Sequence, residues 1–132
     1  MSKSALYMVG ASPNPVTAGG VIPLGAITRR LGTAIRSYGD SIMLLEPGYY
    51  EVSVNATVQP DAAAAIALTV RENDSALAGA NVTATPAAVG DDTPLQIPNA
   101  VVRVFCHTTK TLTFVLSAAA TVSNMAVTVV KV

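Results

Sequence analysis

Apolar and polar residues alternate with a period of two over much of this chain. The longest alternating run is 48–58, in which every second residue from Tyr50 to Val58 is apolar and most residues between them are polar. Successive side chains of a strand point to opposite faces, so this run predicts a half-buried antiparallel strand. The shorter runs 66–71 and 111–117 have the same pattern and predict two further strands of this kind.

Two later segments are apolar at almost every position. Residues 100–106 contain Arg103 as their only charged residue, and residues 126–132 are interrupted only by Thr128 and Lys131. A strand that is apolar on both faces is covered on both faces. In a two-sheet sandwich one face meets the core, so we expect the other face of these strands to meet a neighbouring subunit.

Turn-forming residues separate these runs and indicate the class of fold. Gly, Pro, Asn and Asp cluster between the β-prone segments, and strands that recur at roughly 8–12 residue intervals are typical of a sandwich or barrel. Residues 5–9 are expected to form a first strand and residues 11–20 a loop. A chain of 132 residues suits one domain, so we expect a single all-β domain over residues 1–132.

The composition favours an assembly over an isolated subunit. Hydrophobic residues make up 51% of the chain and charged residues only 12%, against about 25% in typical globular domains. So few charges cannot cover the whole surface, and we expect part of it to be buried between copies. No apolar run approaches the roughly 18 residues of a membrane-spanning helix. The first residues lack the sustained apolar core of a signal peptide, so synthesis in a host cytoplasm is expected.

Charge and titratable residues give no sign of nucleic-acid binding or catalysis. The net charge is zero and the basic residues are dispersed, whereas nucleic-acid binding usually requires a basic stripe. Cys106 is expected to be a small core residue. If a strand runs through Cys106 and His107, their side chains point to opposite faces and cannot form a dyad. One Cys and one His are too few for a zinc site, so we predict no metal, no cofactor and no enzyme.

Several segments resemble the tumour-necrosis-factor/C1q-like (TNF/C1q-like) jelly roll, and most closely its bacterial and phage stand-alone or collagen-linked head domains. The resemblance rests on residues 5–7, 20–25, 68–74 and 122–132, and above all on Pro47-Gly48-Tyr49-Tyr50, where a glycine precedes an aromatic-rich strand. It implies a two-sheet jelly-roll sandwich of about ten strands, with the last strand at an edge beside the first. It also implies a tight homotrimer and a role in display or adhesion. The chain lacks a Gly-X-Y stalk and the dense aromatic packing of animal members.

The strand that contains Arg103 supplies the predicted oligomer interface. Val101, Arg103 and Phe105 share one face, whereas Val102, Val104 and Cys106 share the other, uninterrupted face, which should line the core. We predict that Val101, Arg103, Phe105 and Tyr49 form the interface. Two interpretations of Arg103 remain open. It is an edge residue whose guanidinium reaches water, or it is paired across an interface with Glu51 or Asp40 of its own or a neighbouring chain.

These observations lead to two hypotheses for function. The first is a non-catalytic structural or display protein that forms a homotrimer on a virion surface, as capsid decoration or as the head of a head or tail fibre. Its partners would be other capsid or fibre proteins, with no nucleic acid and no membrane. The alternative is a carbohydrate- or receptor-binding adhesin module, whose pocket would be lined by Tyr7, Tyr38, Tyr49 and Tyr50.

Overall fold

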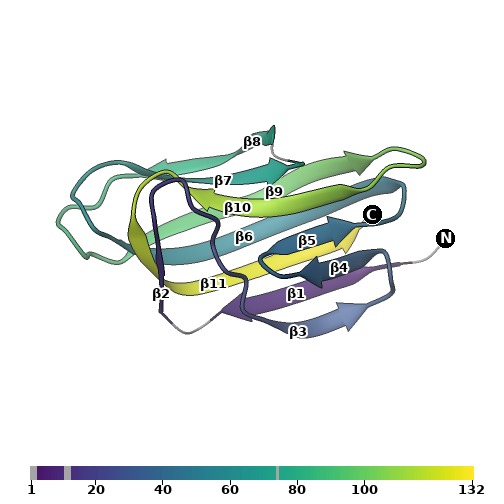
Figure 1. The fold of residues 1–132 in the computed structure, drawn as a ribbon, viewed down its shortest axis with the longest axis horizontal. Coiled ribbons are helices and arrows are strands. Elements are labelled where there is room, and N and C mark those ends of the chain that lie inside the picture. Colours follow the sequence, from purple (N-terminus) through teal and green to yellow (C-terminus); the bar gives the residue numbers. More distant parts are fainter. Residues whose placement is uncertain (1–2, 11–12, 74) are drawn as a thin grey trace.

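The chain folds as a sandwich of two antiparallel β-sheets (Figure 1). The computed structural model describes residues 3–10, 13–73 and 75–132, and within these ranges it contains β-strands and no helix. No described segment is therefore a helix of the length and apolarity that crossing a membrane requires. The structure confirms the predicted all-β class.

Sheet A contains strands in the order β3-β1-β11-β6-β9, and β2 pairs with the first part of β11. Its strands are β1 (Ala5–Gly10), β2 (Asn14–Val16), β3 (Ala26–Leu31), β6 (Gly48–Pro60), β9 (Thr93–Val104) and β11 (Ala120–Lys131). Sheet B has the order β4-β5-β10-β7-β8. Its strands are β4 (Ile35–Tyr38), β5 (Ser41–Leu44), β7 (Ile66–Glu72), β8 (Ser75–Ala84) and β10 (Lys110–Leu116).

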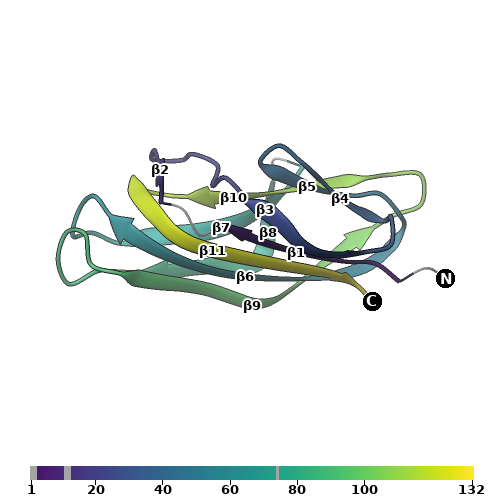
Figure 2. The same cartoon turned by 90° about the horizontal axis from the view of Figure 1, so that it is seen from below.

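The two sheets form two layers whose strands run along the length of the molecule, and the start of β1 and the end of β11 lie at one end of it (Figures 1 and 2). We call this end, which also carries the β9–β10 connection, the terminal end. The opposite end, formed by the β6–β7 and β8–β9 connections, is the far end.

The core confirms the alternation read from the sequence. On β6, Tyr50 to Val58 are buried at every second position. Ile66, Leu68 and Val70 on β7, and Leu112, Phe114 and Leu116 on β10, are buried as well. Among the described residues, Tyr50 and Phe114 are the two aromatic side chains in this core, and aliphatic residues supply the rest of it. One face of each of these strands therefore packs between the sheets, as predicted.

A β-bulge sets which side chains of β9 point outward. Thr93, Leu95 and Ile97 are buried, then Pro98 and Asn99 are both exposed, and burial resumes at Ala100. The register with β6 shifts at the same point, between Val52 and Val54. A bulge inserts an extra residue and reverses the inward–outward phase of the strand beyond it. It therefore points Val101 and Arg103 away from the core.

Two expectations about individual elements were wrong. The predicted loop 11–20 contains the short strand β2, which pairs with β11, although residues 11–12 lie outside the described part of the chain. The last strand does lie beside the first, but it is not at an edge. β11 lies between β1 and β6 near the middle of sheet A: β6 pairs with it from Ala120 to Lys131, and β1 pairs with its second half, from Met125 to Val130.

Candidate functional site

The outward face of sheet A is the candidate functional surface. Paired positions form a row that crosses all five long strands, in the order Leu31, Ala5, Val130, Glu51 and Val101. Glu51 is the only charged residue in this row. Leu31 and Val101, at the two ends of the row, are 59% and 55% exposed, and Val130 is 38% exposed. Apolar side chains of this size at the surface, aligned on one sheet face, indicate an interaction site.

An aromatic cluster of Tyr49, Arg103 and Phe105 lies beside this row, at the β9 edge. Tyr49 on β6 is paired with Arg103 on β9, and Phe105 follows the end of β9. The Arg103 guanidinium carbon lies 4.4 Å from the centre of the Phe105 ring and 5.6 Å from that of Tyr49. Both distances are within the range of cation–π attraction, so the two rings hold the guanidinium on this edge.

The aromatic cluster distinguishes in part between the two interpretations of Arg103, an edge residue or one partner of an ion pair. Arg103 is exposed on an edge strand, as one interpretation expected. Its guanidinium contacts two rings, and in the described part of the chain it forms no ion pair with Glu51 or Asp40. An intramolecular pair is therefore not what holds it. A pair with a neighbouring copy remains a prediction, as does the interface of Val101, Arg103, Phe105 and Tyr49.

An apolar groove runs along the opposite edge of the same face. Two adjoining hollows, of about 220 and 430 Å³, share Ala5 and Leu31 as lining residues. The first continues to Tyr7 and Thr128, and the second to Val130 and Val132. Lys3, Arg29, Arg30 and Lys131 also border it. Sequence reasoning missed this groove, because a fully exposed edge strand such as β3 has no alternation to mark it.

The outward face of sheet B has a more polar character. Thr69 and Thr113 point outward there, on neighbouring strands. At the terminal end, Lys110 Nζ lies 3.1 Å from Glu72 Oε2, and Asn73 Oδ1 accepts a hydrogen bond of 2.9 Å from the Thr111 amide. The ion pair and the hydrogen bond thus satisfy polar groups within the chain at the terminal end of sheet B.

The four tyrosines of the adhesin hypothesis do not converge. Tyr50 is buried in the core and its hydroxyl donates a 2.6 Å hydrogen bond to the Glu46 carbonyl; burial raises its pKa above the ordinary value. Tyr38 is 76% exposed at the β4–β5 turn of sheet B, whereas Tyr7 and Tyr49 lie on sheet A at opposite sides of its face. They do not line one pocket.

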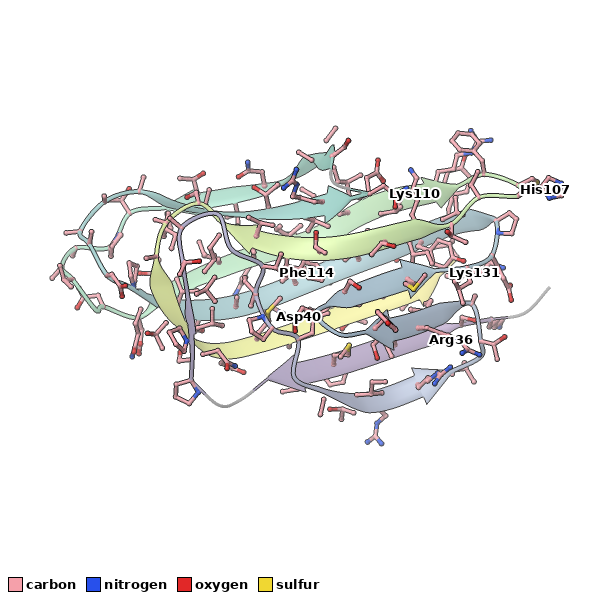
Figure 3. The ribbon with its side chains drawn as sticks, viewed as in Figure 1. Arg36, Asp40, His107, Lys110, Phe114 and Lys131 are labelled. Carbon is pink, nitrogen blue, oxygen red and sulfur yellow. The ribbon has the colours of Figure 1, made fainter. Side chains whose placement is uncertain are left out.

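Cys106 is exposed, so its predicted place in the core was wrong. The reason is that β9 ends at Val104, before Cys106. The next residues turn: the Thr108 amide and hydroxyl both donate to the Phe105 carbonyl, and His107 has φ 62°. His107 projects at the tip of this connection (Figure 3). The described residues contain no group of three or more His, Cys, Asp or Glu that could hold a metal ion.

Comparisons with known proteins identify the fold. No protein-family model and no curated protein sequence matches the chain. Among solved structures it is similar to murine APRIL (TM-score 0.72, 15% identity, covering 98% of this chain and 99% of that one). It is also similar to the globular domain of zebrafish complement 1qA (0.70, 9%, 98% and 96%). The third example is the PRD1 vertex protein P5 (0.60, 19%, 100% and 99%). The chain therefore has the TNF/C1q-like jelly-roll fold that the sequence predicted.

Proposed function

We propose that this chain is a non-catalytic structural or display protein that forms a homotrimer through the outward face of sheet A and sits on a virion surface. The main support is the position of two complementary features on that face. The aromatic cluster lies at the β9 edge and the apolar groove at the β3 edge. A sheet with a projecting aromatic side chain at one edge and an apolar hollow at the other can bind copies of itself.

The two features lie at the same level along the strands, which is what a closed ring requires. Val101, beside the cluster, and Leu31, in the groove, are the two ends of one cross-strand row. Rotation about an axis parallel to the strands keeps every residue at its own level. The cluster of one copy therefore meets the groove of the next, and a head-to-tail contact of this kind closes into a ring.

The chemistry of the two features fits such a contact. Phe105 is 54% exposed, and aromatic and arginine side chains are enriched at the centres of interfaces. Glu51 is exposed in the connecting row and has no ion pair in the described part of the chain. In the ring it faces the adjacent copy and is the natural carboxylate for that copy's Arg103.

The fold supports the proposed number of copies and the proposed location. The resemblance to the TNF/C1q-like jelly roll implies three copies. The similarity to a protein described as a vertex protein, PRD1 P5, supports a place on a virion. Detection of this chain in purified particles by peptide mass spectrometry tests the location. The adhesin alternative has no comparable support, because its tyrosines are scattered over both sheets and the core.

Chemical crosslinking tests how the copies meet. Cys106 is exposed and follows Phe105 directly, so its thiol is a natural crosslinking site beside the aromatic cluster. With Leu31→Cys and a short bis-maleimide, the proposed ring should give covalent dimers and trimers in a denaturing gel. Thr83→Cys, exposed on β8 of sheet B, is the matched control and should give none. A trimeric Leu31→Cys protein that yields no crosslink from position 31 to Cys106 would contradict the edge-to-edge contact.

A further inference from the structure

The charges of this neutral chain are separated along its length. All eight lysine and arginine residues lie toward the terminal end: Lys3, Arg29, Arg30, Arg36, Arg71, Arg103, Lys110 and Lys131. Figure 3 shows Arg36, Lys110, Lys131 and also His107 there, with Asp40 near the middle of the molecule. The domain is therefore electrically polar along its strands.

The charged residues described at the far end are all acidic. Asp61 follows β6, and Asp91 and Asp92 precede β9. Hydrogen bonds from the Gly90 amide to the Pro60 carbonyl (2.9 Å) and from Gln59 Nε2 to Asp92 Oδ1 (3.0 Å) hold the two connections together. The three carboxylates are exposed, and none forms an ion pair in the described residues.

At the terminal end, part of the basic charge is neutralised within the chain and part is not. Lys110 pairs with Glu72 at 3.1 Å and Lys131 with Glu46 at 3.0 Å, whereas Arg103 lies on its two rings. Lys3, Arg30 and Arg36 are exposed and have no ion pair in the residues that the structure covers. We call these three residues the basic corner.

Local packing fixes the backbone beside the basic corner. Gly32, in the turn between β3 and β4, has φ 75°, and a side chain there would collide with the Lys3 carbonyl and the Ser4 hydroxyl. The Ala34 amide donates to Ser4 Oγ at 3.2 Å. The first described residues of the chain are thus fixed against the β3–β4 turn, with Arg30 and Arg36 on either side of it.

We propose that the terminal end docks on a carboxylate-rich protein surface through the basic corner, and that the aspartates of the far end point away from it. Arginine pairs with carboxylates through two parallel hydrogen bonds, and like charge at the far end opposes the reverse orientation. The inference rests on the proposed homotrimer. In a trimeric ring whose copies have parallel strands, the three basic corners point in the same direction. Lys3 and Arg30 border the apolar groove at its terminal end, so the neighbouring copy approaches beside them across the sheet face, and the docking partner approaches along the strands.

The test uses the purified protein and immobilised poly-L-glutamate in buffer of physiological ionic strength. The triple variant Lys3→Gln, Arg30→Gln, Arg36→Gln should bind at least about tenfold more weakly, because interfacial charge pairs contribute strongly when they are complementary. The matched control is Asp61→Asn, Asp91→Asn, Asp92→Asn, which changes the net charge by the same amount in the opposite direction. It should bind within about twofold of wild type, since local complementarity rather than net charge governs the contact.

Each other outcome contradicts either the docking proposal or the proposed homotrimer, and the two can be told apart. If wild type does not bind, or if the aspartate control binds tighter by as much as the triple variant binds weaker, the basic corner is not a docking face. Tighter binding to single-stranded DNA than to poly-L-glutamate would assign it to nucleic acid instead. Loss of the trimer mass in the triple variant would assign it to the subunit interface. A monomeric wild type that still binds through the corner would overturn the homotrimer and leave the docking face standing.

Discussion

At the scale of single residues, neighbours in this sequence have opposite surroundings. Val54 on β6 is fully buried, and Asn55 beside it is exposed on the outward face of sheet A. Val54 faces Val127 and Ile97 on the two adjacent strands, whereas Asn55 faces Ala126 and Gln96. The same substitution at the two positions therefore has different physical consequences.

We expect Val54→Asp to abolish folding and Asn55→Asp to leave the fold intact. A carboxylate at position 54 would be buried without a partner, which costs about 4 kcal/mol or more, a large part of the roughly 5–15 kcal/mol stability of a domain. Thermal unfolding followed by circular dichroism checks both variants. Equal losses of stability at the two positions would show that the register of β6 is wrong.

Residue-level prediction from the sequence succeeds where the strand pattern continues and fails where it ends. The period of two placed Val102 and Val104 inside and Val101, Arg103 and Phe105 outside, as the structure has them. The same alternation wrongly predicted that Cys106 lies in the core, because nothing in the sequence marks the end of β9 at Val104. The stacking of Arg103 on two rings also needed the structure, since Tyr49 comes from another strand.

At the scale of elements, β9 is a free edge of sheet A and presents the aromatic cluster. Pro94 and Pro98 lie on this strand and are exposed. Proline cannot donate to a strand ladder, and its presence on an edge discourages pairing with another strand. Contact with a second copy at this edge is therefore expected through side chains rather than through a continuous sheet.

Arg103→Ala is expected to weaken assembly much more than folding. Within one subunit the substitution removes an exposed cation–π contact, which contributes about 0.5–1 kcal/mol. In the interface, truncation of a central arginine costs about 2 kcal/mol or more, because the partner's carboxylate loses its cation. Sedimentation over a dilution series measures dissociation, with Arg36→Ala, on β4 of the other sheet, as the control. Coincident curves for wild type and Arg103→Ala would show that Arg103 is only a solvated edge residue.

Element order was harder to predict than element type. The segments that form β1, β6, β7, β10 and β11 were recognised from their apolar positions. The central position of β11 was not, because pairing between strands distant in the sequence leaves no local signal. The short strand β2 was missed for a related reason: its three residues include a proline and form a strand only through pairing with β11.

At the scale of the whole molecule, the low charge content has a structural explanation. Both sheets supply inward faces to one core of mostly aliphatic residues, and the outward face of sheet A adds a second set of apolar positions. The chain places most of its few charges toward the two ends of the strands rather than over this face. Such a molecule can bury its apolar face against copies of itself, and its charged ends can determine the orientation of the assembly.

The mass of the purified protein in solution tests the central claim most directly. Light scattering coupled to size exclusion in neutral buffer, repeated over a dilution series, should give three times the 13.4 kDa chain mass. This result is expected because burial of the outward face of sheet A stabilises the trimer. A stable monomer at all concentrations, with the aromatic cluster and the apolar groove open to solvent, would contradict the proposed assembly.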